Sequence, residues 1–193
     1  MTYSAYARPT GVLADAWGRS AVRDVLLTVG AAGAVGLAAQ IAVPVPGSPV
    51  PITGQTFVVL LAGATLGAAR GSAAMLIYLA AGVLGVPWFA DGSSGWPSAT
   101  AGYLVGFVIA TALIGQLAAL GGDRRPLRTV ALMAGGHGLI YLVGVPWLAF
   151  ATGTDLTTAL TTGLVPYLIG DVLKVLLAAA LLPGAWMLIH RRR

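Results

Sequence analysis

Apolar residues occupy most of the chain in long runs that are separated by short polar segments. About 20 apolar residues cross a hydrocarbon core of about 30 Å, so runs of this length predict transmembrane helices. Six such runs cover residues 25–43, 52–69, 71–87, 101–120, 129–150 and 164–189. The second and third meet at Arg70, and we interpret them as a tight hairpin because one helix of their combined length would exceed a single crossing. The pattern predicts an all-α integral membrane protein with six transmembrane helices.

The basic residues agree with this alternation of spans. Six crossings place ten of the eleven Lys and Arg residues on one side of the membrane and none on the other. The ten are Arg8, Arg19, Arg23, Arg70, Arg124, Arg125, Arg128 and Arg191 to Arg193. Because positively charged loops stay in the cytoplasm, both termini and the 121–128 loop are predicted to be cytoplasmic. The loops 44–51, 88–100 and 151–163 are then predicted to face outside.

This topology divides the chain into three parts. Residues 1–24 are a cytoplasmic N-terminal segment, 25–190 a six-helix transmembrane domain that binds a substrate, and 191–193 a basic cytoplasmic C-terminus. Two interpretations of residues 11–17 stay open: a segment on the membrane surface, or part of a disordered tail.

Composition supports a membrane protein and excludes several other classes. Hydrophobic residues make up 58% of the chain and charged residues 9%, with a mean hydropathy of +0.87. A soluble domain carries about 25% charged residues, so this surface must face lipid. The net charge of +5 does not indicate nucleic-acid binding, because the basic residues form short clusters between apolar runs. Cysteine is absent, and His137 and His190 have no carboxylate at ligand spacing along the chain, so no metal site is expected.

Asp171 and Lys174 are charged residues inside the last apolar run. At about 1.5 Å per residue they lie about 10 Å and 15 Å along that helix, so Lys174 is near the bilayer midplane. A charge there costs roughly 2.5–3.5 kcal/mol on insertion scales. The spacing i, i+3 places both side chains on one helix face, where they can pair. One interpretation is a self-neutralising packing contact. We favour a ligand site, because an apolar pair would pack as well without the insertion cost.

Two predicted outer loops supply further candidate ligand contacts. Four prolines among residues 44–51 favour a stiff, extended backbone. This loop is either a connector or a preformed lid over a cavity, with Thr53 and Gln55 as polar contacts. The predicted outer loop at 88–100 and its flanking residues add aromatic and polar side chains. These suit either a membrane-interface belt or the wall of a small-ligand pocket. The remaining candidate contacts are Trp88, Phe89, Asp91, Tyr103 and, in the fifth run, Tyr141.

A row of small residues follows the first apolar run. Gly30, Ala34 and Ala38 recur every four positions, which lets another helix approach closely. The row is either internal packing or a docking face for another membrane subunit.

Together these residues resemble the BioY family, the biotin-binding S-components of energy-coupling-factor (ECF) transporters. The resemblance runs from about residue 38 to 181. Its motifs are Pro-Val-Pro-Ile-Thr-Gly-Gln-Thr at 49–56, the segment 78–90, Ala-Gly-Tyr-Leu-Val-Gly-Phe at 101–107, the segment 144–149, and Gly-Asp-Val-Leu-Lys at 170–174. The proline segment followed by the Gly-Asp-x-x-Lys segment is specific. The chain departs from the family at 98–103, where Ser-Ala-Thr-Ala-Gly-Tyr replaces the usual Gly-Pro-Thr-Gly-Gly-Tyr.

The resemblance implies a six-helix protein of the bacterial cytoplasmic membrane that captures biotin from outside. It also implies a transmembrane T-component and a pair of ABC-type ATPases as partners. Biotin is the transported ligand, and no cofactor is expected. The chain has no Walker-type Gly-x-x-x-x-Gly-Lys sequence, so any ATP hydrolysis must come from elsewhere. We expect the ureido head of biotin at Asp171 and Lys174, with its carboxylate at the outer mouth, because a carboxylate is far costlier to bury.

Two other functions stay open at this stage. A membrane enzyme could use Asp171 and Lys174 as an acid–base pair, but no nucleophile, histidine pair or carboxylate cluster accompanies them in the sequence. A sibling S-component could bind another vitamin.

Overall fold

The computed structural model describes residues 11–18 and 20–191. Of the basic residues used for the topology, Arg8, Arg19, Arg192 and Arg193 lie outside these ranges. The elements in chain order are η1 (Leu13–Trp17), α1 (Ala21–Ala39), β1 (Ala42–Val43), β2 (Ile52–Thr53), α2 (Gln55–Leu66), α3 (Ala68–Val83), η2 (Ala90–Gly92), α4 (Ala101–Ala119), α5 (Pro126–Thr152), α6 (Leu156–Gly163), η3 (Val165–Tyr167) and α7 (Leu168–Arg191).

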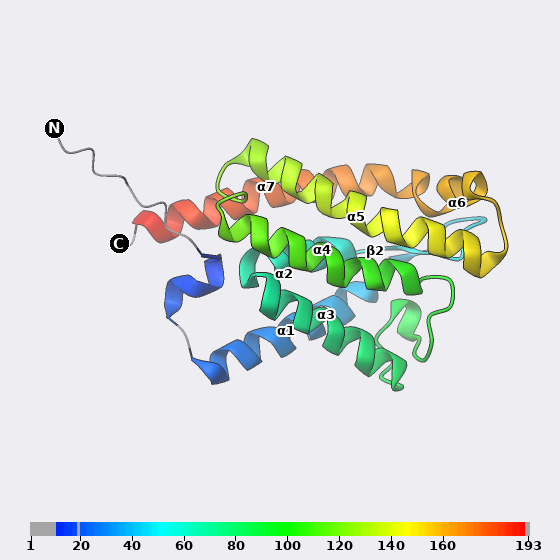
Figure 1. The fold of residues 1–193 in the computed structure, drawn as a ribbon, viewed down its shortest axis with the longest axis horizontal. Helices are drawn as coiled ribbons and strands as arrows, with labels where there is room; N and C mark the ends of the chain where they lie inside the picture. The colour runs from blue at the N-terminus through cyan, green and yellow to red at the C-terminus, as the bar shows by residue number, and fades with distance from the viewer. Residues whose placement is uncertain (1–10, 19, 192–193) are drawn as a thin grey trace.

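The helices form a bundle with α4 at its centre, packed against α2, α3 and α5 (Figure 1). Glycines make these close approaches possible, because a methyl group would collide with the neighbouring backbone. A Cβ at Gly115 would lie 2.2 Å from the backbone nitrogen of Ala68, and one at Gly106 would lie 3.0 Å from the Cα of Ile140. The core of the bundle therefore depends on backbone contact as much as on large side chains.

The structure is helical, as the sequence predicts, but the six-span count is not confirmed. Within the described residues, four helical segments are long and apolar enough to cross a membrane: Ala21–Ala39, Ala101–Ala119, Pro126–Thr152 and Leu156–Ile189. The runs expected at 52–69 and 71–87 form helices of only 12 and 16 residues. At about 1.5 Å per residue, these helices are shorter than a bilayer core of about 30 Å.

The boundary between the second and third helices lies earlier than the sequence suggested. The chain turns at Gly67, which has a φ of +84° and separates α2 from α3. Arg70, which the hydropathy pattern placed at the junction, already belongs to α3. A φ in the left-handed region is available to glycine without the clash that a Cβ would cause, so Gly67 is the residue that permits this turn.

The expected loop at 151–163 is largely helical, which corrects the sequence-based assignment. Helix α6 occupies residues Leu156–Gly163, and Asp155 caps it by accepting a hydrogen bond from the backbone N–H of Thr158 at 2.8 Å. The hydropathy pattern missed this helix because four threonines interrupt its apolar positions. A side-chain oxygen before a helix is typical of a helix N-cap, so Asp155 was the available signal.

Residues 11–17 are ordered and so are not part of a disordered tail, whereas their place on the membrane surface stays a prediction. They include the short helix η1, whose buried residues Leu13 and Ala14 pack against the end of the bundle. Arg70 holds this end together, because its guanidinium lies 2.7 Å from Asp15 and 2.9 Å from Asp24. The first transmembrane helix begins at Ala21, four residues before the expected run.

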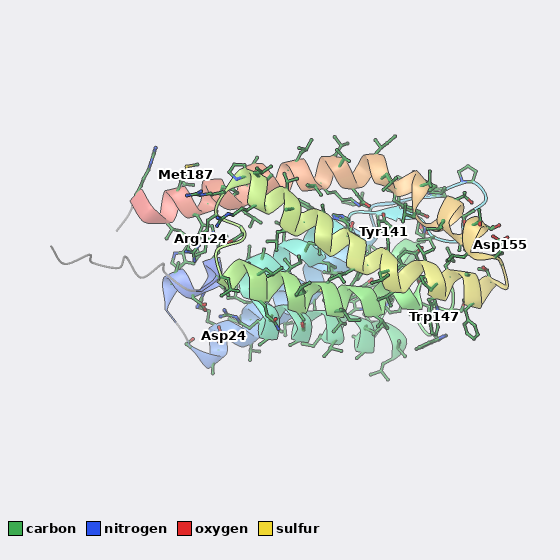
Figure 2. All side chains as sticks on the ribbon, turned by 45° about the horizontal axis from the view of Figure 1, so that its top comes forward. Asp24, Arg124, Tyr141, Trp147, Asp155 and Met187 are labelled. Carbon is green, nitrogen blue, oxygen red and sulfur yellow. The ribbon has the colours of Figure 1, made fainter. Side chains whose placement is uncertain are left out.

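Different residues lie at the two ends of the bundle. Asp24, Arg124 and Met187 lie at one end, whereas Trp147 and Asp155 lie at the other (Figure 2). Strands β1 and β2 pair antiparallel, with Ala42 opposite Thr53, and close the proline-rich loop into a hairpin.

Candidate functional site

A cavity of about 410 Å³ opens between the proline-rich hairpin, the loop that follows α3, and helices α2, α4, α5 and α7. Eight of the nine candidate ligand contacts line it, although they come from distant parts of the chain. They are Thr53, Gln55, Phe89, Asp91, Tyr103, Tyr141, Asp171 and Lys174. The ninth, Trp88, does not line the cavity. The cavity is therefore where the sequence motifs converge.

Asp171 and Lys174 form the charged end of this cavity. The Nζ of Lys174 lies 3.2 Å from Oδ1 of Asp171 and donates to Oγ1 of Thr56 at 2.8 Å. The hydroxyl of Tyr141 on α5 donates to Oδ2 of Asp171. Asp171 is 6% exposed, so its charge depends on these partners rather than on water.

His137 is a further member of this cluster that the sequence analysis did not assign to the site. Its Nε2 lies 3.3 Å from Oδ1 of Asp171, although the contact is not aligned as a hydrogen bond. Its Nδ1 faces the carbonyl of Met133 at 2.9 Å. His137 and Tyr141 are four residues apart on α5, so both face α7. The i, i+4 spacing could have suggested that His137 and Tyr141 act together. It does not identify Asp171 as their partner, because that requires knowing that α5 packs against α7.

Gln55 is hydrogen-bonded to an aromatic wall of the cavity that Tyr78 and Phe89 form. Its side-chain N–H donates to the hydroxyl of Tyr78 at 2.8 Å, and the hydroxyl of Thr53 donates to its carbonyl oxygen at 3.0 Å. Tyr78 packs edge-on against Phe89, with ring centroids 5.3 Å apart. Trp88 supports the wall from behind, because its indole N–H donates to the Tyr78 carbonyl at 2.9 Å. Trp88 therefore positions the wall without lining the cavity.

The loop that follows α3 is held by Gln40, which the sequence analysis did not single out. The side-chain N–H of Gln40 donates to the carbonyls of Trp88 and Phe89, each at 3.1 Å, and its oxygen accepts from Gly92 N–H. Asp91, at the cavity mouth, adopts a φ of +57°. A left-handed φ is uncommon for residues other than glycine, so the loop is tightly constrained here.

Tyr103 forms another part of the wall. Its hydroxyl donates to the carbonyl of Gly163 at 2.8 Å, which ties α4 to the end of α6. Its ring packs edge-on against Tyr141, with ring centroids 6.4 Å apart. Gly144 leaves space for that ring, since a Cβ there would lie 2.4 Å from it.

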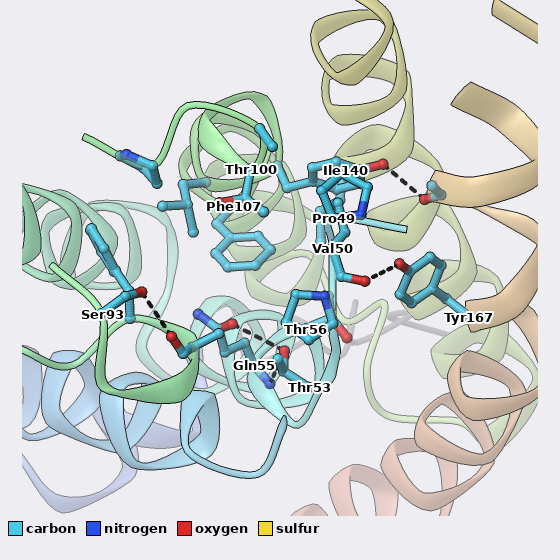
Figure 3. Close-up of a pocket in the computed structure, with 18 of the residues that line it drawn as sticks. Pro49, Val50, Thr53, Gln55, Thr56, Ser93, Thr100, Phe107, Ile140 and Tyr167 are labelled. Carbon is cyan, nitrogen blue, oxygen red and sulfur yellow. Dashed lines mark hydrogen bonds between the residues drawn. The ribbon is translucent and has the colours of Figure 1, made fainter. Parts of the chain in front are cut away.

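The proline-rich hairpin is fastened over the cavity by Tyr167, a residue that sequence reasoning missed. The hydroxyl of Tyr167 donates to the carbonyl of Val50 at 2.5 Å (Figure 3). It also lies 3.1 Å from the hydroxyl of Ser48. Val50 is buried, and Pro49 and Pro51 line the cavity beside it. Tyr167 precedes Asp171 by four residues, so a shared helix face was the signal that could have suggested it.

The small-residue row on α1 does not form one uniform surface. Gly30 is exposed and has open space around it, and Ala34 is partly exposed. Ala38 is 7% exposed, and its carbonyl accepts from the N–H of Gly54 at 3.2 Å. Ala38 therefore belongs to internal packing, whereas Gly30 and Ala34 leave part of α1 open.

Comparisons with known proteins identify the family. The model of the BioY family matches residues 10–191. The chain belongs to the BioY family.

Relatives named as biotin transporters occur in several bacteria. The chain is 37% identical to the biotin transporter BioY of Rhizobium etli over 143 residues, which cover 69% of this chain and 76% of the relative. It is 34% identical to BioY of Thermotoga maritima, over 71% of this chain and 81% of the relative. It is 32% identical to BioY2 of Lactococcus lactis, over 78% of this chain and 84% of the relative. BioY proteins are transporters, so the enzyme interpretation is set aside.

A solved structure shares the fold. It is a crystal structure of the S-component for biotin from an ECF-type ABC transporter, with a TM-score of 0.76 and 22% identity. The match covers 86% of this chain and 94% of the solved chain. The arrangement of α1 to α7 is thus the fold of an S-component.

Proposed function

We propose that the chain captures biotin in the 410 Å³ cavity and serves as the substrate-binding subunit of a biotin uptake system. The observation that carries this proposal is the convergence of Asp171, Lys174, Gln55 and the Tyr78–Phe89 wall on one cavity. An apolar pocket with a few placed polar groups is typical of small-ligand sites. Biotin, with an apolar bicyclic ring and a polar ureido group, complements such a pocket.

The hydrogen-bond capacity of the charged end supports a ureido ligand. An ammonium has three donors, and two of those on Lys174 face Asp171 and Thr56. A carboxylate has about four acceptor positions; Tyr141 and Lys174 donate to two of those on Asp171, and the His137 ring lies beside a third without an aligned hydrogen bond. One donor and one acceptor are left, which match the carbonyl and one N–H of a ureido group. The carboxylate tail then extends toward the hairpin at the outer mouth of the cavity.

Titration of the purified protein with biotin tests this proposal directly. We expect saturable binding by isothermal titration calorimetry, and biotin recovered intact from the complex. Riboflavin and thiamine, offered at the same concentrations, should not bind. Preferential binding of another vitamin would contradict biotin as the substrate, and recovery of a converted product would contradict a transport role.

The proline-rich hairpin is proposed to act as the lid of the binding cavity. Prolines restrict the backbone before the ligand arrives, so less conformational entropy is lost when the lid closes. Tyr167 secures the lid through Val50 and Ser48, and Gln55 follows its second strand. Opening of the lid therefore requires that the Tyr167 contacts break, so that the hairpin separates from η3.

Replacing Tyr167 with phenylalanine should accelerate biotin release about 2- to 12-fold, because one hydrogen bond contributes about 0.5–1.5 kcal/mol. The association rate should change much less. Stopped-flow measurement with a fluorescent biotin derivative gives both rates. Thr157→Val, which alters an exposed hydroxyl on α6, is the control. An unchanged release rate in Tyr167→Phe would show that the hairpin is not fastened by this contact.

We further propose that the open part of α1 docks a transmembrane T-component, whose paired ATPases supply the energy. The exposed Gly30 and the partly exposed Ala34 leave a shallow strip, which lets a partner helix approach closely. The strip is separate from the cavity, because neither residue lines it.

Ala34→Trp should abolish co-purification with a T-component while biotin affinity stays within about 2-fold, because the added side chain fills the strip by overpacking. Val29→Trp is the control, since Val29 is exposed on the same helix but projects from a different face than Gly30 and Ala34. Pull-down and calorimetry on the same preparations give both quantities. A parallel loss of assembly and biotin binding would show that Ala34 serves internal packing.

We propose that the end of the bundle that carries Arg124 faces the cytoplasm of a bacterial cell and the cavity faces outside. Basic residues gather at the cytoplasmic end of membrane proteins. In a chain without native cysteine, Ser93→Cys should react with an impermeant thiol reagent in whole cells, whereas Arg125→Cys should react only after the cells are opened. The reverse pattern of labelling would invert the topology.

A further inference from the structure

Three arginines surround a second cavity at the opposite end of the bundle from the biotin site. This cavity has a volume of about 220 Å³ and lies where α4 turns into α5. Its lining consists of Leu120, Gly121, Arg124, Arg125 and Arg128. Gly121, with a φ of +92°, makes the turn that brings the end of α4 beside the arginines. The cavity shares no residue with the biotin site.

The positive charge of this cavity is only partly compensated. Among the described residues, Arg124, Arg125 and Arg128 form no ion pair, whereas Arg70 is paired with both Asp15 and Asp24. Asp123 is the adjacent carboxylate, but it is fully buried, and its Oδ2 accepts from the indole N–H of Trp186 at 2.7 Å. Burial raises the pKa of Asp123. Even with Asp123 ionised, three arginines and one aspartate leave a local charge of +2.

Arg124 is held in place by the bundle rather than by an anion. Its Nη2 donates to the carbonyl of Gly11 at 3.2 Å, and its guanidinium carbon lies 4.5 Å from the ring centroid of Trp186. Its Nε is buried and has no hydrogen-bond partner within the described part of the chain. A guanidinium offers five donors and binds phosphate oxygens in a fixed geometry, so the exposed Arg125 and Arg128, which also line the cavity, suit a phosphate group.

Apolar residues flank the arginines and distinguish a lipid from a free anion. Leu120 is 72% exposed and Leu127 is 82% exposed, on the two sides of the turn. Pro126 begins α5, and the backbone N–H groups of its first turn lack partners within the helix, which adds to the positive potential. A cationic cavity between exposed leucines at the end of a membrane bundle matches a phosphate headgroup with its acyl chains.

We propose that the turn between α4 and α5 binds the headgroup of an anionic phospholipid. The phosphodiester lies among Arg124, Arg125 and Arg128, and the acyl chains contact Leu120 and Leu127. This inference does not depend on the identity of the transported ligand, because the two cavities are separate.

Native mass spectrometry of the purified full chain in detergent tests the site. Phosphatidylglycerol, phosphatidylcholine and inorganic phosphate are added in turn as probes. We expect one phosphatidylglycerol to bind at least 10-fold more tightly than phosphatidylcholine, and the double variant R125Q/R128Q to lose roughly 10- to 30-fold, since each basic residue near an anionic lipid surface contributes about 1 kcal/mol. R191Q removes an exposed charge that does not line the cavity, so it should lose less than about 2-fold.

Two further measurements keep the result unambiguous. Biotin binding by R125Q/R128Q should equal that of the native chain, which shows that the variant is folded. Inorganic phosphate should not displace the lipid. Equal binding of both phospholipids, or full retention of phosphatidylglycerol by R125Q/R128Q, would overturn the proposal. Displacement by phosphate would instead identify a free-anion site and equally reject a lipid.

Discussion

Lys174→Met is expected to weaken biotin binding by roughly 10- to 150-fold, because a hydrogen bond from a charged donor contributes about 1.5–3 kcal/mol. Methionine keeps most of the side-chain length but removes the ammonium that faces Asp171 and Thr56. The buried Asp171 then loses its cationic partner on α7, so the thermal stability of the unliganded protein should also fall. Calorimetric titration and thermal unfolding in detergent measure the two effects separately.

A second variant separates charge balance from ligand recognition. Lys174→Met combined with Asp171→Asn removes both charges, so thermal stability should return toward the native value while biotin binding stays weak. Recovery of binding in this double variant would show that the pair only balances charge and does not contact the ligand.

Biotin amide tests the orientation of the ligand on the same two proteins. With the ureido head at Lys174, neutralising the distant carboxylate should reduce affinity for the native chain only modestly. Lys174→Met should then weaken biotin and the amide to a similar degree. If the amide fails on the native chain, and Lys174→Met binds biotin and the amide equally weakly, the carboxylate lies at Lys174 and the proposed pose is wrong.

Gly115→Ala is expected to destabilise the protein by about 3 kcal/mol or more, although alanine is a better helix former than glycine. The added Cβ would lie 2.2 Å from the backbone nitrogen of Ala68 and 2.5 Å from the carbonyl carbon of Gly67. Backbone atoms at the α2–α3 junction cannot rotate away as a side chain can, so α4 must separate from that junction.

Gly135→Ala provides the matched control for Gly115→Ala. Gly135 is also inside a long helix, but a Cβ there would meet no atom within 4 Å. Its substitution should be neutral or stabilise the protein by up to about 1 kcal/mol through helix propensity. Tryptophan fluorescence during heating in detergent gives both midpoints. Equal midpoints for the two variants would show that the close approach at Gly115 does not limit the packing.

The candidate site was largely predictable because burying charge in a membrane is costly. Asp171 and Lys174 interrupt an apolar run, and a proline-rich segment precedes Thr53 and Gln55, so these local patterns identify four residues that line the cavity. His137, Tyr78 and Tyr167 were not predicted, because nothing along the chain indicates which residues they contact. Their roles follow from their partners Asp171, Gln55 and Val50, each of which lies in another helix or in the hairpin.

The sequence by itself determined the membrane environment, the helical class and the charged end of the site. Hydropathy and the cost of buried charge depend on local stretches of sequence, so both can be evaluated without the tertiary structure. The tertiary structure alone decided which helices are short, where Gly67 ends α2, and which face of α5 meets Asp171. These features depend on backbone approach between helices, as at Gly115 and Ala68, and such contacts leave no periodic pattern in either segment.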